Sequence, residues 1–363
     1  MTRFLQGTKQ ALSQAYHLAL LDLDGVVYLG KNPIDHAADS IRAAEHAGMT
    51  VEYTTNNSSR FQRVVAEQLR GFGLDVEPWQ IITSAVVAAR MVARHVDAGS
   101  SVLVLGAEHL REEVSGQGLR VVEGAQDNPQ AVIQGWYPDL AWHELAEASF
   151  AVERGAAYFV TNRDLTIPRE LGIAPGCGSL IQAVITATGV EPVASAGKPE
   201  SAMYDEARLL AARDGEEPVE KQACLAIGDR LDTDIEAGNR GGYDSLAVLT
   251  GVTNPHELMT APAHLRPTYI VPDLRGLNEA QPAPVRDESG AWCCGTAQGA
   301  ADGTETAAKA WIEDGELHVS DGNGDSDNAV SSVNALRAAC CLAWEYADSG
   351  NDIAAIALPD FDL

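Results

Sequence analysis

The feature that most constrains the fold is a pair of aspartates at the end of an apolar run. Residues 17–21 read HLALL and lead directly into Asp22 and Asp24, which Gly25 follows. An apolar run that stops at a glycine is typical of a buried strand in a parallel sheet. Ligands bind at the carboxyl edge of such sheets, where both acids would lie. Two acids one residue apart can share a hard cation, and one of them can attack an electrophile.

The segments after this strand alternate between helix and strand patterns. Residues 37–47 carry apolar residues at helical spacing, residues 50–55 alternate like a strand, and residues 64–69 are helical again. A strand is expected over 223–227 and a last strand over 246–249. This order predicts an α/β fold with a doubly wound, Rossmann-like parallel sheet as its core.

The length of 363 residues exceeds what one core usually holds, so more than one domain is expected. The core is predicted to comprise residues 1–84 and 186–280. Residues 85–185 have a βα rhythm of their own and are predicted to form an inserted α/β cap. A linker, QPAP, precedes a small α+β extension over 286–363. Within the extension we expect a hairpin around 310–319, a helix over 330–346 and a closing strand over 353–358.

Composition excludes some partners and locations. The net charge of -27 argues against a nucleic-acid or anionic-membrane partner, because both require a basic face. No run of 18 apolar residues predicts a membrane span, and the first residues lack the apolar core of a signal peptide, so a cytoplasmic location is expected. Homo-oligomerisation is left open. The six cysteines include two vicinal pairs without zinc-like spacing, which favours buried reduced thiols over a metal or disulfide joining the pairs.

Four polar clusters each follow a predicted strand or open a predicted helix. They are Asp22 with Asp24, Thr55 with Asn56 and Asn57, Lys198, and Asp229 with Asp234. A doubly wound sheet would bring all four to one edge. Together they suit phosphoryl transfer, in which one carboxylate attacks phosphorus and another acts as general acid and base. Mg²⁺ and a lysine would offset the repulsion between the attacking acid and the phosphate.

Each cluster also has a simpler interpretation. The first could begin a calcium loop, but the glycine and glutamate that such a loop needs are absent at the required spacing. The second could be a helix N-cap, Lys198 a solvated helix start, and the last two acids a capping pair. Residues 321–327 also imitate the start of a calcium loop, yet Ser326 and Ser332 replace its glycine and glutamate, so a flexible acidic loop is expected.

The four motifs are DLDGVVY at 22–28, TTNNSSR at 54–60, GKP at 197–199 and GDRLDTDI at 228–235. In this order, with an α/β insertion of about 100 residues between the second and third, the chain resembles the haloacid dehalogenase superfamily of phosphatases. Within it, the chain is similar to the subfamily that includes nitrophenylphosphatase-type, pyridoxal-phosphate and phosphoglycolate phosphatases.

The resemblance implies roles for the acids. Asp22 would be the nucleophile that forms an aspartyl-phosphate. Asp24 would protonate the leaving alcohol and then activate water. Mg²⁺ would be bound by Asp22, the Asp24 carbonyl and Asp229, with Asp234 in or near the second shell.

The resemblance also assigns the polar residues. Thr55 and Asn56 would hold the phosphoryl group, Asn57 would support the loop, and Lys198 would bridge the phosphate and the nucleophile. Like other caps of this type, residues 85–185 would close over the site and select the leaving group.

Within the predicted cap, residues 162–164 match a family-like loop, so Asn162, Arg163 and Asp164 are candidate substrate contacts. Arg163 either recognises a second negative charge or is simply a solvated loop residue. At 134–137 the sequence QGWY departs from relatives, which often carry an acid there, so no relative's substrate transfers directly.

The extension suggests a substrate. Some actinobacterial relatives that hydrolyse glycerol 3-phosphate carry a C-terminal piece resembling a truncated acetyltransferase, and the resemblance implies that residues 286–363 correspond to it. No glycine-rich pyrophosphate loop is visible, so packing, regulation or assembly is expected rather than transferase activity.

The expected function is a Mg²⁺-dependent phosphatase of a small phosphorylated metabolite, with glycerol 3-phosphate preferred. The alternative substrates are phosphoglycolate, pyridoxal phosphate and a nucleotide monophosphate. A phosphotransferase or mutase, and a non-catalytic binding protein, are the alternatives of other classes.

Overall fold

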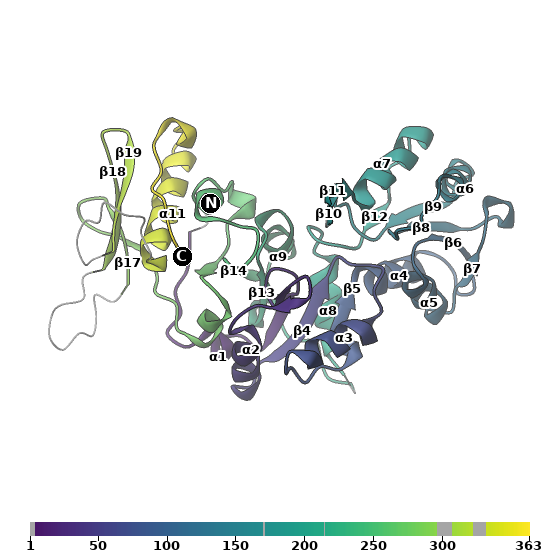
Figure 1. The fold of residues 1–363 in the computed structure, drawn as a ribbon, viewed down its shortest axis with the longest axis horizontal. Coiled ribbons are helices and arrows are strands. Elements are labelled where there is room, and N and C mark those ends of the chain that lie inside the picture. The colour runs from purple at the N-terminus through teal and green to yellow at the C-terminus, as the bar shows by residue number, and fades with distance from the viewer. Residues whose placement is uncertain (1–3, 170, 214, 296–306, 322–331) are drawn as a thin grey trace. The chain divides into compact units, whose positions relative to one another are not determined.

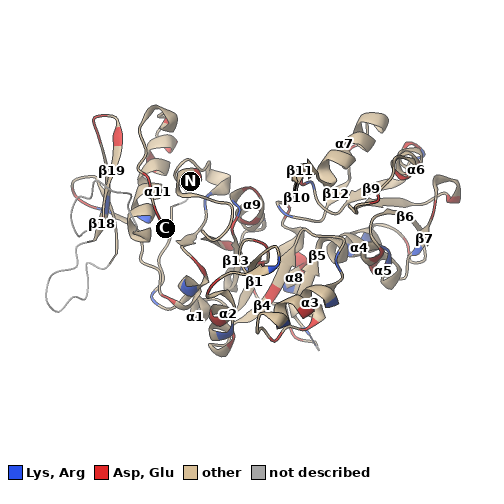
Figure 2. Cartoon of the chain, viewed as in Figure 1, with Lys and Arg blue, Asp and Glu red and all other residues tan. Residues whose placement is uncertain are grey.

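The structure is a computed structural model that describes residues 4–169, 171–213, 215–295, 307–321 and 332–363 (Figure 1). The chain divides into two compact units, each described by itself. Unit 1 comprises Met1–Val51 and Ala212–Leu363, and unit 2 comprises Glu52–Ala211. No helix in the described part of the chain is long and apolar enough to cross a membrane. Figure 2 shows acidic residues in both units, including the turn between β18 (Ala308–Glu313) and β19 (Glu316–Ser320).

Unit 1 contains four neighbouring parallel strands in the order β15-β14-β13-β1. Leu18 to Leu21 and Cys224 to Ile227 are fully buried, as expected for central strands with both faces covered. The strands are β1 (Leu18–Asp22), β13 (Cys224–Gly228), β14 (Asp244–Val248) and β15 (Tyr269–Val271). Helices α1 (Leu12–Ala15), α2 (Ala37–His46), α9 (Glu236–Gly241) and α10 (Pro255–Met259) accompany them.

The expectation that 246–249 forms the last strand of this sheet was wrong, because β15 follows it. Strand β15 has only three residues, too few for an alternating pattern to stand out. Its extended conformation is fixed by pairing with Leu246 to Val248 of β14. The Tyr16 hydroxyl lies 2.9 Å from the hydroxyl of Tyr269 and donates to Asp244 at 2.8 Å, which ties the ends of both strands to α1.

The C-terminal part of unit 1 is an antiparallel sheet covered by one long helix. The sheet order is β16-β17-β18-β19, and α11 (Val333–Asp348) contacts three of the strands. The strands are β16 (Val285–Arg286), β17 (Trp292–Cys294), β18 (Ala308–Glu313) and β19 (Glu316–Ser320). The expected hairpin is confirmed, and its turn residues Asp314 and Gly315 have φ of 49° and 82°, as a type I′ turn requires.

Three other expectations concern this part of the chain. The closing strand over 353–358 was wrong, because Ile353–Ala355 forms a 3-10 turn that the Asp352 side chain caps, leaving Ala357 in a single bridge with Glu316. The acidic loop lies, apart from Asp321, outside the described residues. All six cysteines are buried thiols outside any disulfide, as expected. Burial raises the pKa of Cys294 to about 11 and that of Cys341 to about 12.

Unit 2 is built on a five-stranded parallel sheet in the order β12-β9-β8-β6-β7. Figure 1 shows α6 and α7 on one face of this sheet and α4 and α5 on the other. The expected strands over 102–105, 131–134 and 157–161 are present as β6 (Ser101–Leu105), β8 (Ala131–Gln134) and β9 (Ala157–Val160). The short strands β7 (Arg120–Val122) and β12 (Ala194–Ser195) were not anticipated.

The remaining strands of unit 2 lie outside this five-stranded sheet. Strand β4 (Thr50–Thr55), within which the unit boundary falls, pairs in parallel with β5 (Ile81–Thr83). An unanticipated hairpin joins β10 (Thr166–Arg169) and β11 (Gly172–Pro175). The helices are α3 (Gln62–Gly71), α4 (Ser84–His95), α5 (Glu108–Gly116), α6 (Trp142–Glu153), α7 (Cys177–Thr188) and α8 (Ala202–Ala211).

Candidate active site

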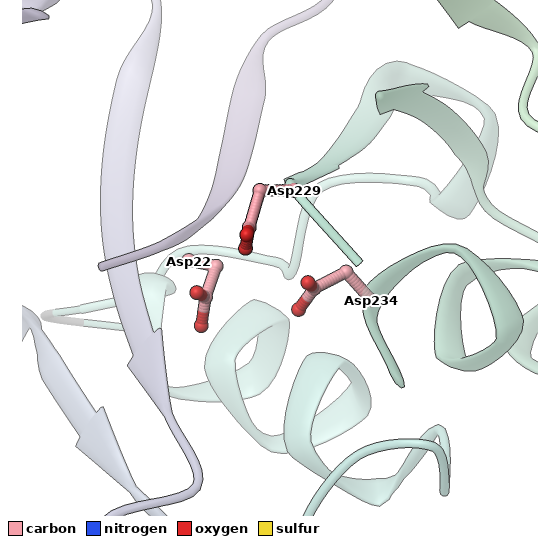
Figure 3. A group of neighbouring side chains, drawn as sticks. All are labelled: Asp22, Asp229 and Asp234. Carbon is pink, nitrogen blue, oxygen red and sulfur yellow. The ribbon is translucent and has the colours of Figure 1, made fainter. Parts of the chain in front are cut away.

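Three acidic side chains converge in unit 1. Asp22 ends β1, Asp229 directly follows β13, and Asp234 lies in the π-helical turn Leu231–Ile235. Their carboxylates point toward one another, and one oxygen from each lies within 4.8 Å of the others (Figure 3). Asp229 and Asp234 are each only 1% exposed. We call these three residues the acid cluster.

Backbone groups hold Asp229 in place. The amide of Val252 donates to Asp229 Oδ2 at 2.7 Å. A Cβ at Gly251 would lie 1.9 Å from the same oxygen, and a Cβ at Gly25 would lie 2.4 Å from it. Gly25 also has a φ of +88°, which side chains rarely adopt. The two glycines therefore allow two chain segments to approach the carboxylate from different directions.

Asp234 is held in the same manner. Its Oδ2 accepts a hydrogen bond from the backbone amide of Arg230 at 3.1 Å. A Cβ at Gly228 would lie 2.2 Å from Asp234 Cβ, so the end of β13 must be glycine. The π-helical turn places Asp234 on the side facing Asp22 and Asp229, and such turns are frequent at functional sites.

The acid cluster fits a divalent cation. Three carboxylates at this separation repel one another, and the repulsion is large because two of them are buried. Carboxylate oxygens are the ligands that Mg²⁺ prefers in proteins. Asp24 lies outside the three-acid group, and its side chain is exposed next to the buried Gly25.

A second cluster lies in unit 2 and centres on the side-chain amide of Asn56. Asn56 Oδ1 accepts from the backbone N–H of Lys198 at 2.8 Å, and Asn56 Nδ2 donates to the Lys198 carbonyl at 2.9 Å. A Cβ at Gly197 would lie 2.7 Å from Asn56 Oδ1, so glycine is needed for this approach. Lys198 is 2% exposed. The Asn56 amide thus engages both polar backbone groups of the lysine, whose position it fixes.

The predicted substrate loop belongs to this second cluster. Asn56 Nδ2 also lies 3.3 Å from both carboxylate oxygens of Asp164. Asn162 Nδ2 donates to the Asn56 carbonyl at 2.8 Å, and the Ser84 hydroxyl donates to the same carbonyl at 2.7 Å. We call Asn56, Asn162, Asp164 and Lys198 the amide cluster.

The segment that carries Asn162 and Asp164 is fixed at the start of α7. The amide of Gly178 donates to the Asp164 carbonyl at 2.9 Å, and a Cβ at Gly178 would lie 2.3 Å from the Arg163 carbonyl. The Arg163 side chain is exposed and pairs with Glu191 at 3.4 Å. Arg163 is therefore the one member of the predicted substrate loop that the amide cluster does not engage.

The loop after β4 is organised by Asn57. Its side-chain Oδ1 accepts from the backbone amides of Ser59 and Arg60 at 2.9 and 3.0 Å, and its backbone N–H donates to Thr55 Oγ1 at 3.2 Å. These bonds form the local turn that asparagine favours. The supporting role expected of Asn57 is consistent with this geometry.

Sequence reasoning missed the residues that hold Asp229, namely Gly251 and Val252. They lie three and four residues after the end of β14, at the carboxyl edge where functional loops are expected. The sequence GVT was a signal that could have been used, because a glycine after a strand permits close approach of the backbone.

Comparisons with known proteins identify the family. Residues 19–120 match the family described as haloacid dehalogenase-like hydrolase, and residues 195–277 match the family described as HAD-hydrolase-like. The chain is 39% identical over 270 residues to D-glycerol 3-phosphate phosphatase of Mycobacterium tuberculosis, covering 74% of this chain and 73% of that protein. The chain belongs to the haloacid dehalogenase-like hydrolase family.

Further relatives support the assignment of this HAD-like hydrolase. A 5'-nucleotidase of Bacillus subtilis is 34% identical over 261 residues, which cover 72% of this chain and 97% of that protein. The structure of p-nitrophenyl phosphatase from Archaeoglobus fulgidus has a TM-score of 0.66 at 30% identity and covers 72% of this chain and 98% of its own. The predicted α/β fold class and the predicted enzyme class, a phosphoric monoester hydrolase, are confirmed.

One solved structure is similar over more of the chain. The glycerol phosphate phosphatase of M. tuberculosis in complex with magnesium has a TM-score of 0.76 at 34% identity, and covers 93% of this chain and 92% of its own. It covers 93% of this HAD-like hydrolase, whereas the A. fulgidus structure covers 72%. The difference is about a fifth of the chain, which is also the fraction of the chain that residues 286–363, the C-terminal extension, make up.

Proposed function

We propose that this HAD-like hydrolase is a Mg²⁺-dependent phosphatase that hydrolyses glycerol 3-phosphate through a covalent phosphoryl intermediate on Asp22. The observation that carries the proposal is the acid cluster, in which three carboxylates lie within 4.8 Å of one another. Bound Mg²⁺ would neutralise charge on the phosphoryl oxygens and on the acids.

The roles of the acids follow from their surroundings. Asp22 is only partly buried at the end of β1, so one of its oxygens can reach a substrate. It would attack phosphorus and displace the glycerol oxygen, and Asp24, which is exposed and outside the cluster, would protonate that oxygen. Asp24 would then take a proton from the water that hydrolyses the intermediate. Asp229 and Asp234 would hold the cation.

The amide cluster would position the phosphate-binding groups. Lys198 would stabilise the negative charge of the transferred group, and Thr55 and the backbone N–H of Asn56 would donate to its oxygens. Because the Asn56 amide binds the Lys198 backbone, we propose that its side chain positions the lysine. Asn162 and Asp164 would fix the same loop, while Arg163, exposed, could contact a charged leaving group.

The choice of glycerol 3-phosphate is supported by the D-glycerol 3-phosphate phosphatase relative and by the fraction of the chain that the related mycobacterial structure covers. The 5'-nucleotidase relative supports a nucleotide monophosphate as the second candidate.

We also propose the domain boundaries predicted from the sequence. The core comprises residues 1–84 and 186–280, the cap residues 85–185 and the extension residues 286–363. A cytoplasmic location is supported by the six buried cysteines, none of which forms a disulfide, because such thiols suit a reducing compartment.

The test is phosphate release from a panel containing both enantiomers of glycerol 3-phosphate, phosphoglycolate, pyridoxal phosphate, nucleotide monophosphates and sugar phosphates. Each ester is measured with Mg²⁺ and with EDTA, and ranked by kcat/KM. We expect metal-dependent release that is fastest for glycerol 3-phosphate. A higher kcat/KM for another ester would make that ester the proposed substrate. The absence of metal-dependent release from every ester would reject the proposed phosphatase activity.

Added glycerol or sugar as acceptor, with transfer exceeding hydrolysis, would indicate a phosphotransferase. Light scattering of the same sample gives the oligomeric state.

A further inference from the structure

We propose that the C-terminal extension holds the metal site in its binding geometry, by fixing the loop that binds Asp229. This inference rests on the proposed Mg²⁺ site. We call residues 250–253 the support loop. The contacts that carry the inference run within unit 1, from the support loop through α10 to α11.

The support loop binds both segments that carry the site. Val252 and Thr253 donate backbone hydrogen bonds to Asp229, the first to Oδ2 at 2.7 Å and the second to the carbonyl at 3.0 Å. The Thr250 hydroxyl donates to the Gly25 carbonyl at 2.6 Å, next to Asp24. A displacement of the loop would therefore move the Asp229 carboxylate and the backbone after β1 together.

The support loop continues directly into α10. Asn254 caps this helix, accepting from the Glu257 amide at 3.0 Å while Glu257 Oε2 accepts from the Asn254 amide at 3.3 Å. The helix spans only five residues, so it requires tertiary contacts to stay formed. Leu258 and Met259 supply them, because both are fully buried in one apolar cluster with α11.

Helix α11 binds the segment around the end of α10 directly through Trp344 and, by way of Arg266, through Asp348. The indole N–H of Trp344, which is fully buried, donates to the Leu258 carbonyl at 2.8 Å. Arg266 donates to the Ala261 carbonyl at 3.0 Å, and its guanidinium forms a bidentate pair with Asp348 at 2.7 and 2.8 Å. Leu258 lies at the end of α10, where carbonyls lack partners within the helix, and Ala261 lies just beyond it, so these bonds fix the end of α10 and the segment after it to the extension.

A second connection reaches Asp234. Leu231 and Ile235, which lie in the same π-helical turn as Asp234, belong to the apolar cluster that contains Trp344, Cys340 and Leu336 of α11. The extension thus packs behind both buried acids of the cluster. A protein without it would have to cover this apolar surface in another way.

The decisive experiment compares two variants of α11 in the full chain. Trp344→Phe keeps an aromatic ring but removes the hydrogen bond to α10. Arg337→Lys is the matched control: Arg337 is also a buried donor of α11, but it donates to the Ile270 carbonyl on β15 and to the side chains of Gln281 and Asn334, none of which belongs to the support loop or α10. Mg²⁺ affinity is measured by titration calorimetry without substrate, and Tm is measured in EDTA.

We expect both variants to lower Tm, and Trp344→Phe alone to weaken Mg²⁺ binding by about 3- to 10-fold, less than the loss usual for direct outer-shell partners. Asp348→Asn, which weakens the pair with the buried Arg266, should also weaken Mg²⁺ binding, by a smaller factor, and serves if Trp344→Phe does not fold. Equal Mg²⁺ affinities in the wild type, Asp348→Asn and Trp344→Phe would overturn this inference alone. A wild-type protein that binds no Mg²⁺ would instead reject the proposed metal site.

Discussion

The acid cluster and the amide cluster are held in place by different means. The acids of unit 1 are fixed by backbone N–H groups and by glycines whose missing side chains leave room for the carboxylates. The amide cluster of unit 2 is fixed by one side chain, Asn56, which donates and accepts at the same time.

The difference follows from the charges. Carboxylates only accept hydrogen bonds, so a cluster of them needs donors from the surrounding backbone and a cation to offset repulsion. An amide carries both donors and an acceptor, so a single asparagine can join several segments. We therefore expect the acid cluster to be sensitive to added volume and the amide cluster to be sensitive to loss of one group.

The largest effect should come from the acid cluster itself. Asp22→Asn removes the nucleophile and one cation ligand, and we expect phosphate release to fall by at least about 10³-fold while the protein stays folded. Release and circular dichroism are measured together. Asp232→Asn is the control, because Asp232 is an exposed acid of the same π-helical turn as Asp234. Retained activity in Asp22→Asn would assign the nucleophile elsewhere.

Added volume should damage the acid cluster without changing its charge. In Gly25→Ala the new Cβ would lie 2.4 Å from Asp229 Oδ2. Displacing this ligand should weaken Mg²⁺ binding by about 10- to 100-fold in calorimetry. Gly30→Ala introduces similar backbone strain at a φ of +62°, but nothing lies within 4 Å of its Cβ. Equal affinities of the two variants would show that the strain, and not the contact with Asp229, matters.

Loss of one group should damage the amide cluster. Asn56→Ala removes the bonds to the Lys198 backbone, and we expect kcat to fall by about 10- to 100-fold through misplacement of the lysine. Mg²⁺ affinity should not change, in contrast to Gly25→Ala. Weakened Mg²⁺ binding in Asn56→Ala would mean that the two clusters depend on each other.

Acid should lower the stability of unit 2 by protonating a buried histidine. Of the predicted effects, this one is the smallest on activity at neutral pH. Burial lowers the pKa of His109 from 6.5 to about 4, and its Nε2 lies 3.0 Å from the hydroxyl of Thr83, next to Ser84, which donates to the Asn56 carbonyl. The unfolded chain therefore binds a proton at His109 before the folded chain does. Stability should fall as the pH drops from 6.5 to 4, by up to about 3 kcal/mol.

Chemical denaturation across this pH range measures the effect. Glu113 lies 3.7 Å from His109 and burial raises its pKa, which contributes in the opposite direction, so the comparison is made with His109→Gln. The wild type should lose more stability than this variant on acidification. Parallel stability curves would show that His109 does not titrate as described.

The sequence by itself determined the elements with a strong local pattern and the chemistry attached to them. Helical spacing located α2, α4 and α11, and the Asp-Gly turn located the β18–β19 hairpin, because these patterns depend on neighbouring residues. The acids after β1 and β13 were predicted to meet at one edge, because parallel strands bring such residues together, and the family resemblance implied that they bind Mg²⁺. The structure gathers three of them.

Only the tertiary structure decided how these residues are held. The Asn56 amide binds Lys198, 142 residues away, and Trp344 binds Leu258, 86 residues away. Val252 donates to Asp229 across 23 residues, and the short strand β15 is ordered by its pairing with β14. Contacts between distant segments leave no periodic pattern in the sequence. Residue types and spacing therefore predicted which groups take part, whereas packing and long-range hydrogen bonds fixed their positions.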